Sequence, residues 1–264
     1  MAAITALQLI TRILEKSGAA NRPQSIDHVS AGDPTTRVTG IATMALPSLD
    51  CLKRAAAAGR NLILTYDPAF WSSNDNLDRL ESNDLFLEKR DFIRTHNLVC
   101  FNLHDHWRDR TPDGIAEGMA AGLGWTQYQR RDNPAGFQLP PTTLLDLARD
   151  LQTRLNEPTL RVVGDPKLAV RNVASLWGNG AQMPAIQLLN TNIDVLVTGY
   201  AREWEAVEYA QDMIATGEKK GLILLGEAAS VDLGMKYCAQ WIATFVEEVP
   251  AEFIPSRSPY WGIS

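Results

Sequence analysis

Two distant stretches of this chain share one strand–helix–strand pattern, and this repetition limits the folds that the chain can adopt. The first stretch begins at Val38-Thr39-Gly40 and ends at Tyr66-Asp67. The second begins at Val197-Thr198-Gly199 and ends at Gly226-Glu227. A strand, a helix and a second strand in this order build a parallel sheet. The pattern therefore predicts an α/β fold of two pseudo-symmetric lobes around a central cleft.

Each stretch ends in a carboxylate directly after its second strand, Asp67 in the first and Glu227 in the second. Ligands of α/β sheets bind at the carboxyl ends of the strands. We therefore expect Asp67 and Glu227 to face each other across the cleft, and we judge other candidate residues against this pair.

Strands and helices alternate along most of the chain, as expected for the α/β class. Strands are predicted at residues 38–43, 61–65, 98–103, 160–163, 170–177 and 251–254 and in the second copy of the repeat. Gly178-Asn179-Gly180, after the strand 170–177, is expected to form a flexible turn. Helices are predicted at residues 4–18, 49–58, 85–95, 114–123, 143–155, 182–191 and 232–245. Ser48 is expected to cap the second of these helices, and Thr142 or Thr143 the fifth. The turn-rich segment 126–142 marks the boundary between a first lobe, residues 1–130, and a second lobe, residues 131–264.

Composition excludes some classes of partner. The net charge of −6 argues against a nucleic-acid-binding surface. The cysteines Cys51, Cys100 and Cys238 are odd in number and far apart, which favours buried, reduced thiols. No segment resembles a secretory leader or a membrane span, so we expect a cytoplasmic protein, although a processed chain would look the same.

The order of several short motifs resembles a known family. Gly32-Asp33-Pro34 precedes Val38-Thr39-Gly40, an apolar strand then ends in two polar residues and Pro68, and the next strand ends at His104. Near the C-terminal end, Gly226, Ser230 and Gly234-Met235 follow one another in the pattern Gly-x-x-x-Ser-x-x-x-Gly-Met. This order resembles the Nif-three-like dinuclear metal centre family, some of whose members carry the label GTP cyclohydrolase I type-two homologue. The resemblance implies two α/β lobes around a cleft, without an inserted domain, and a ring-shaped homohexamer.

The metal-ligand positions of that family have changed in this chain. The five positions hold Tyr66, Asp67, Arg108, Glu227 and Val231, while His104 keeps the histidine that opens the second block. Two neighbouring divalent cations need several anionic or imidazole ligands. An arginine has the wrong charge, and a valine has no donor atom. The resemblance therefore implies a member with a degraded dinuclear metal site, acting as a binding or scaffold protein of unknown biochemical function.

A single-metal enzyme stays an open alternative. Asp67 and Glu227 could ligate one hard divalent cation such as Mg²⁺ or Ca²⁺, with His104 or His106 recruited as a further ligand. The protein would then be a metal-dependent hydrolase of nucleotides or phosphoesters. Alternatively, the guanidinium of Arg108 lies between the two carboxylates and neutralises them through charge-assisted hydrogen bonds.

We expect the cleft to hold a small ligand. Further residues expected to line it are Tyr66, Arg108, His106 and Glu203. His106 is also interpreted as a loop residue with a capping role, and Glu203 as a helix residue that favours the helix dipole. Ser230 is predicted to cap the helix that begins near Asp232. Trp71, Trp107, Tyr260 and Trp261 are interpreted as interface or cleft aromatics, without a choice between the two.

Overall fold

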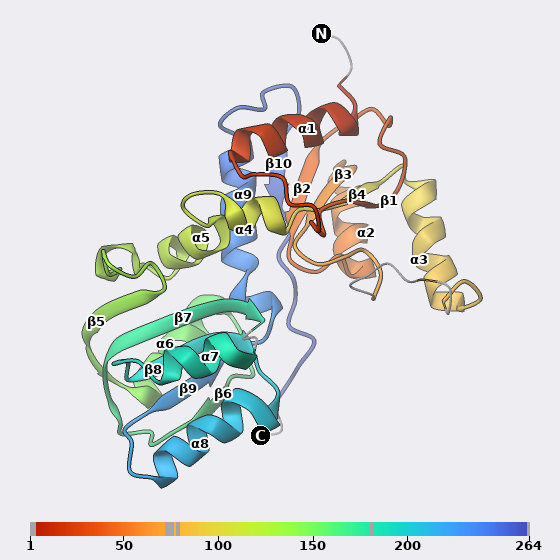
Figure 1. Cartoon of the computed structure of the whole chain (residues 1–264). Coiled ribbons are helices and arrows are strands. Elements are labelled where there is room, and N and C mark those ends of the chain that lie inside the picture. The colour runs from red at the N-terminus through yellow and green to blue at the C-terminus, as the bar shows by residue number, and fades with distance from the viewer. Residues whose placement is uncertain (1–3, 72–76, 78–79, 180–181, 263–264) are drawn as a thin grey trace. The chain divides into compact units, whose positions relative to one another are not determined.

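The computed structural model describes residues 4–71, 77, 80–179 and 182–262, which form two compact units. The first unit comprises Met1–Gly118 and Gly234–Ser256, and the second comprises Met119–Leu233 and Arg257–Ser264. Each contains a five-stranded sheet with helices, so the predicted α/β class is confirmed (Figure 1). The expected lobes followed chain order, whereas the segment carrying strand β10 (Ala251–Phe253) and most of helix α9 (Asp232–Ile242) returns to the first unit.

The sheet of the first unit has the strand order β1-β4-β3-β2-β10. Its other strands are β1 (Val29–Ala31), β2 (Ile41–Met44), β3 (Leu62–Thr65) and β4 (Val99–Asn102). All neighbours are parallel except β1 and β4. Helices α2 (Leu49–Ala57) and α3 (Asp84–Thr95) bury apolar side chains against one face, where Ala42, Ile63 and Cys100 point. On the other face, the Thr43 hydroxyl donates to the Met235 carbonyl of α9 at 2.7 Å.

The sheet of the second unit has the strand order β5-β7-β8-β9-β6. Its strands are β5 (Gly136–Thr143), β6 (Arg161–Val163), β7 (Ala169–Asn179), β8 (Val195–Tyr200) and β9 (Gly221–Leu224). β7, β8 and β9 are parallel, and β5 and β6 are antiparallel to their neighbours. Helices α7 (Gln182–Leu189) and α8 (Glu208–Ala215) pack on the face that carries Ala174, Leu196 and Leu222.

Several helices begin at a side chain that caps their first turn. In α1 (Ala6–Ser17), Thr5 and Gln8 form a reciprocal capping box. Ser48 accepts the Cys51 N–H at the start of α2. Thr143, one of two predicted caps, accepts the Asp146 N–H at the start of α6 (Leu144–Leu155). Each cap satisfies an N–H group that the first helical turn would otherwise leave without a partner.

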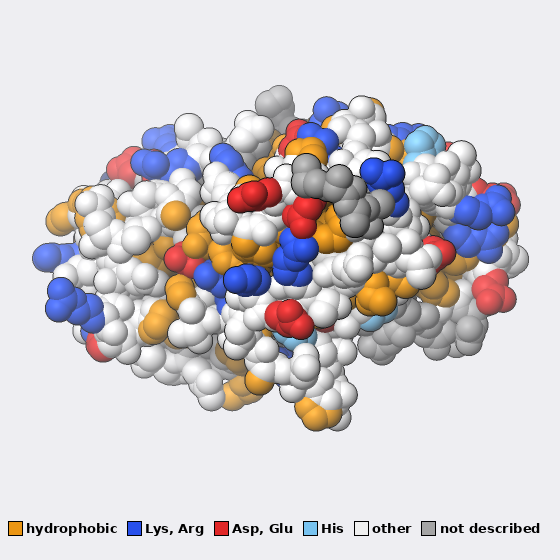
Figure 2. Space-filling view, turned by 90° about the horizontal axis from the view of Figure 1, so that it is seen from above, with side chains coloured by type: hydrophobic (Ala, Val, Ile, Leu, Met, Phe, Trp, Pro, Cys, Tyr) orange, Lys and Arg blue, Asp and Glu red, His pale blue; other side chains and the backbone are white. Residues whose placement is uncertain are grey.

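The remaining helical segments are short. After β4 come α4 (Asp105–Asp109) and α5 (Gly114–Gly122), and a 3₁₀ turn spans Thr126–Tyr128. A π-helical turn, Glu203–Val207, precedes α8, and a 3₁₀ turn, Ala228–Ser230, precedes α9. Among the described residues, no helix has the length and apolar character needed to cross a bilayer. On the face shown in Figure 2, acidic and basic side chains are interspersed.

Some strands lie where the sequence predicts turns. β5 includes Pro140-Pro141 and was expected to be part of a turn-rich boundary. It is an edge strand, and edge positions tolerate proline because the missing N–H need not pair. β7 continues through Gly178, which was expected to open a flexible turn; Gly180, the end of that turn, lies outside the described residues.

The two units contain the same succession of elements. In the first unit it runs α1-β1-β2-α2-β3-α3-β4, and in the second it runs α6-β6-β7-α7-β8-α8-β9. In both, the short first strand pairs antiparallel with the last strand. A Gly-Asp-Pro turn follows that short strand and returns to the first helix: Leu7 N–H donates to Pro34 at 2.8 Å, and Leu145 N–H to Pro166 at 3.1 Å.

This structural repeat corrects the one read from the sequence. Val-Thr-Gly precedes β2 in the first stretch but lies inside β8 in the second. β2-α2-β3 therefore corresponds to β7-α7-β8, and not to β8-α8-β9.

The hydrogen-bond register fixes the equivalent positions. The Leu103 N–H donates to Thr65 at 2.8 Å, and the Leu225 N–H donates to Thr198 at 2.9 Å. Counting forward from these pairs, Asp67 corresponds to Tyr200, and Glu227 corresponds to Asp105. The two carboxylates thus follow different strands of the repeat.

Candidate functional site

The carboxyl ends of β3 and β4 bring two predicted site residues into contact. The Tyr66 ring packs against the His104 imidazole with centroids 4.5 Å apart and planes tilted by 47°. Tyr66 is buried and His104 is half-buried. Asp67 follows Tyr66, and its N–H donates to the Ala45 carbonyl at 3.1 Å, which extends the parallel ladder by one step. These residues lie at the sheet edge where α/β folds place ligands.

Arg108 lies on α4 and forms an ion pair that the sequence did not suggest. Its Nε is 3.1 Å from Oδ2 of Asp113. Asp113 also caps α5, where Oδ1 accepts the N–H groups of Ile115 at 2.8 Å and Ala116 at 3.1 Å. Burial raises the pKa of Asp113 even though Arg108 and these donors act to lower it. The signal for Asp113 was Pro112-Asp113-Gly114, an acidic cap before a helix.

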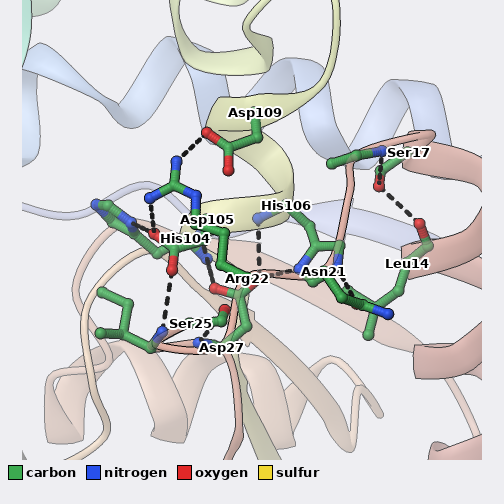
Figure 3. A network of polar contacts seen from close by, with 12 residues as sticks. Leu14, Ser17, Asn21, Arg22, Ser25, Asp27, His104, Asp105, His106 and Asp109 are labelled. Carbon is green, nitrogen blue, oxygen red and sulfur yellow. Dashed lines mark hydrogen bonds and ion pairs between the residues drawn. The ribbon is translucent and has the colours of Figure 1, made fainter.

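His106 lies in α4 and is buried, so its predicted place in a loop is wrong. Its Nδ1 is 2.8 Å from Asp27 Oδ2, and its Nε2 is 3.0 Å from Asn21 Oδ1 (Figure 3). The Asp27 carboxylate also accepts the backbone N–H groups of His104 at 2.8 Å and Asp105 at 2.7 Å. His106 therefore helps to anchor the start of α4, in line with its expected structural role.

Asp105 links the same network to the segment between α1 and β1. Its Oδ1 is 3.0 Å from Nδ1 of His104, and its Oδ2 accepts the Ile26 N–H at 3.0 Å. Arg22 pairs with both Asp105 and Asp109 (Figure 3). Burial opposes ionisation, but the hydrogen bonds from His104 and Ile26 outweigh it and lower the pKa of Asp105. The network fixes α4, and with it the side chains that α4 presents.

In the second unit, Glu227 lines a cavity of about 610 Å³. The remaining lining residues come from the ends of β6, β8 and β9 and from the last part of the chain; they are Thr159, Arg161, Tyr200, Leu224, Gly226, Tyr260 and Trp261. Glu203 is exposed, with Oε1 3.6 Å from the guanidinium of Arg161. The cavity thus has aromatic walls and one side chain of each charge.

Ser230, the predicted cap of the helix that begins near Asp232, forms two bonds outside that helix. Its hydroxyl donates to the Glu227 carbonyl at 2.7 Å and accepts the Gly178 N–H at 3.0 Å. Ser230 is fully buried, and so is Val231. This pair of bonds ties the turn that carries Glu227 to the end of β7.

Asp67 belongs to the first unit and Glu227 to the second, so their approach across a cleft stays a prediction. The placement of Arg108 between them stays one too. In the part of the chain that the structure describes, no group of three or more His, Cys, Asp or Glu side chains is arranged to hold a metal ion. Of the four aromatics singled out, Trp107 is fully buried and Trp71 is exposed.

Solved structures share this fold along the whole chain. A protein named ybgI, of unknown function, is 19% identical, with 97% of this chain and 100% of that chain covered and a TM-score of 0.77. A hypothetical protein of Staphylococcus aureus, SA1388, is 18% identical over 99% and 100%, with a TM-score of 0.73. A Bacillus cereus protein related to NIF3 is 12% identical over 100% of both chains, also with a TM-score of 0.73.

At these identities the structures establish the fold alone. No curated protein sequence matches the chain significantly. Residues 5–218, most of the chain, match the sequence profile of Duf34/NIF3, NGG1p interacting factor 3. The order of motifs along the sequence points to the same family. The chain therefore belongs to the Duf34/NIF3 family.

Proposed function

We propose that this chain is a NIF3-family protein that keeps the fold, has lost the dinuclear metal chemistry, and acts as a binding or scaffold protein. One observation carries the proposal: the Nε of Arg108 lies 3.1 Å from Asp113 Oδ2. Arg108 stands where the family resemblance expects a metal-binding carboxylate. A guanidinium cannot lose its charge at ordinary pH, and held by a neighbouring carboxylate it repels a cation at this position.

The neighbouring groups support the same proposal. The Nδ1 of His104 is occupied by Asp105, and its ring packs on Tyr66. Tyr66 replaces an expected histidine, and a neutral phenol is a poor ligand for a hard divalent cation. The donor set of the first unit therefore does not fit two closely spaced metal ions.

Metal content per chain, measured by inductively coupled plasma mass spectrometry, tests the proposal. The wild type, Asp67→Ala and Asp91→Ala are dialysed without chelator and compared; Asp91 is an exposed carboxylate of α3 and serves as the matched control. We expect substoichiometric metal in all three. Near-stoichiometric metal that is lost only in Asp67→Ala would overturn the proposal and favour the single-metal hydrolase.

From the family resemblance, we also propose that the chain forms a homo-oligomer, with a hexamer as the expected assembly. Sedimentation equilibrium of the untagged chain measures this directly. A single species at the mass of six chains supports a ring assembly as the scaffold, and a monomer at all concentrations contradicts it.

A further inference from the structure

The cavity of the second unit has the makings of a ligand site in its own right. It lies where β8 and β9 end, at the edge at which parallel sheets bind ligands. Its volume of about 610 Å³ falls within the usual range for small-molecule pockets. We call it the strand-end cavity; its lining residues are Thr159, Arg161, Tyr200, Leu224, Gly226, Glu227, Tyr260 and Trp261.

The aromatic wall of this cavity is held in place by a buried carboxylate. Glu157 is 7% exposed, and its Oε1 accepts the Thr159 N–H at 3.2 Å and the Thr159 hydroxyl at 2.9 Å. The same oxygen accepts the Ser258 hydroxyl at 2.8 Å, and Ser258 Oγ in turn accepts the Tyr260 N–H at 3.3 Å. Residues 258–261 are therefore docked beside Thr159 by specific bonds, which brings Tyr260 and Trp261 to the cavity.

These aromatics are exposed although they border a cavity. Tyr260 is 65% exposed and Trp261 is 78% exposed, and Tyr200 lines the same space. Large exposed rings beside a hollow favour a ligand that covers them. A planar ring in the ligand would bind to such aromatic faces by stacking on them.

The charged lining residues select the polar groups of that ligand. Arg161 pairs with exposed Glu203 at 3.6 Å, a surface ion pair that contributes little and that an anion can displace. A guanidinium matches phosphate or carboxylate oxygens. Glu227 offers carboxylate oxygens, which accept hydrogen bonds from ring N–H groups. Its turn is rigid because Ser230 fixes the Glu227 carbonyl.

Glycine at position 226 leaves room for such a ligand. Gly226 has a φ of 91°, and a side chain added there would meet no atom within 4 Å. Backbone at this position is therefore open to close approach by a bound molecule.

We infer that the strand-end cavity binds a planar nitrogen heteroaromatic that carries an anionic group, with the ring on Trp261, a ring N–H on Glu227 and the anion on Arg161. This inference rests on the proposed function in treating the chain as a binding protein. It assigns that binding to the strand-end cavity of the second unit.

Isothermal titration calorimetry of the full chain provides the test. The probes are guanosine 5′-monophosphate, riboflavin 5′-phosphate, and ribose 5-phosphate, which lacks the ring. We expect at least one ring phosphate to bind once per chain with a micromolar Kd, and ribose 5-phosphate to bind at least a hundredfold more weakly. Absence of binding by both ring phosphates at millimolar concentration would overturn the inference, and so would equal binding of ribose 5-phosphate.

Variants test the ring contact and the anion contact separately. Trp261→Ala is expected to weaken the ring phosphate at least tenfold, whereas Trp204→Ala leaves it unchanged, because Trp204 is similarly exposed but does not line the cavity. Arg161→Ala is expected to weaken the phosphate-bearing probe tenfold and to leave the matching nucleoside or riboflavin unaffected. Equal losses in Trp261→Ala and Trp204→Ala would contradict the assignment.

Two controls keep the conclusions apart. Sedimentation of Trp261→Ala without ligand shows whether the aromatics join subunits; dissociation of an oligomer without any ring binding would replace the ligand site by a protein interface. Metal content of the same preparation tests the proposed function separately. Metal-free protein that ignores both ring phosphates contradicts this inference alone, and metal-loaded protein that binds them contradicts the proposed function alone.

Discussion

The first and second units build the same succession of elements from different side chains, and they finish their strands differently. In both, a Gly-Asp-Pro turn follows the short antiparallel strand, and its glycine adopts a positive φ, 88° at Gly32 and 126° at Gly164. In both, the aspartate side chain bonds the N–H two residues on, Thr35 and Lys167, each at 2.8 Å. The shared backbone demands the same turn chemistry.

The strand ends differ because different segments cover them. After β4, helix α4 is fastened by Asp27 and His106, and Arg108 is held by Asp113. After β9, a 3₁₀ turn leaves the strand-end cavity open beside Glu227. The repeat therefore fixes the backbone scaffold of both units. The segments that follow the strands determine whether a strand end is covered by polar contacts, as after β4, or borders a cavity, as after β9.

Replacing the turn glycines Gly32 and Gly164 by alanine is expected to lower the free energy of unfolding more than any other substitution considered for the two units. A Cβ at Gly32 would collide with the Leu98 carbonyl, and one at Gly164 would lie 2.8 Å from the Lys220 carbonyl. We expect Gly32→Ala to lower the free energy of unfolding by about 3–5 kcal/mol and Gly164→Ala by about 2–4 kcal/mol, from left-handed strain plus overpacking. Urea unfolding measures both.

Matched controls for these variants are Gly59 and Gly217, one in each unit. Both have positive φ, 73° and 99°, and a Cβ would meet no atom within 4 Å. Alanine there is expected to cost only about 1–2 kcal/mol from backbone strain. If the turn glycines cost no more than these controls, close packing of the two turns is not what the units share.

Asp27 sharpens the comparison because its role has no counterpart in the second unit, where the corresponding residue by strand register is Leu160. Asp27→Ala leaves buried N–H groups at the start of α4 and the His106 imidazole without their acceptor. We expect a loss of about 2–4 kcal/mol. Hydrogen exchange should show the loss confined to amides of the first unit; equal loosening of both units would contradict the account.

Lys89 on α3 gives a pH-dependent difference between the units. Its ammonium donates to the Ala69 carbonyl and lies 5.2 Å from the Trp71 ring centroid, and burial lowers its pKa to about 8. On the corresponding helix of the second unit, α8, Ala210 is the buried residue. Between pH 8 and about 10.4 the unfolded chain binds more protons at Lys89 than the folded chain, so this residue makes stability rise with pH in that window.

Comparison with Lys89→Met isolates the effect. Buried thiols at Cys100 and Cys238 have raised pKa values, which makes stability fall above about pH 9, but they are present in both proteins. We expect the wild type to gain about 2–3 kcal/mol relative to Lys89→Met between pH 7.5 and 10.5. Urea unfolding across this range measures it, and parallel stability curves would rule out a buried, titrating lysine.

The smallest expected loss of stability concerns a hydrogen bond that both units contain, from a backbone N–H to a side-chain oxygen. Asn61 Oδ1 accepts the Thr39 N–H at 2.8 Å, and Asp194 Oδ2 accepts the Arg171 N–H at the same distance, so an amide and a carboxylate play one part. Alanine at either site is expected to cost about 1 kcal/mol. Thermal unfolding of Asn61→Ala and Asp194→Ala measures both losses; destabilisation by only one of the two variants would show that the two positions are not equivalent.

The α/β class, most helices and parallel strands, and the family could be predicted from the amino-acid sequence alone. Apolar runs bounded by glycine, proline and capping residues are local signals, and Ser48 and Thr143 began their helices as predicted. Cys51, Cys100 and Cys238 are buried as expected. These features depend on residues close together in the chain, so a single sequence suffices to predict them.

The alignment of the repeat and the contacts of the candidate residues became visible in the folded structure alone. The copies of Val-Thr-Gly matched in letters but not in register, whereas Gly32-Asp33-Pro34 and Gly164-Asp165-Pro166 mark the equivalent turns. Arg108 pairs with Asp113, His106 bonds to Asp27, and Trp261 and Glu227 line one cavity. These residues belong to segments that are distant in sequence or separated by a turn. Such contacts depend on which strands pair and in what order, and the hydrophobic periodicity of each segment does not determine this.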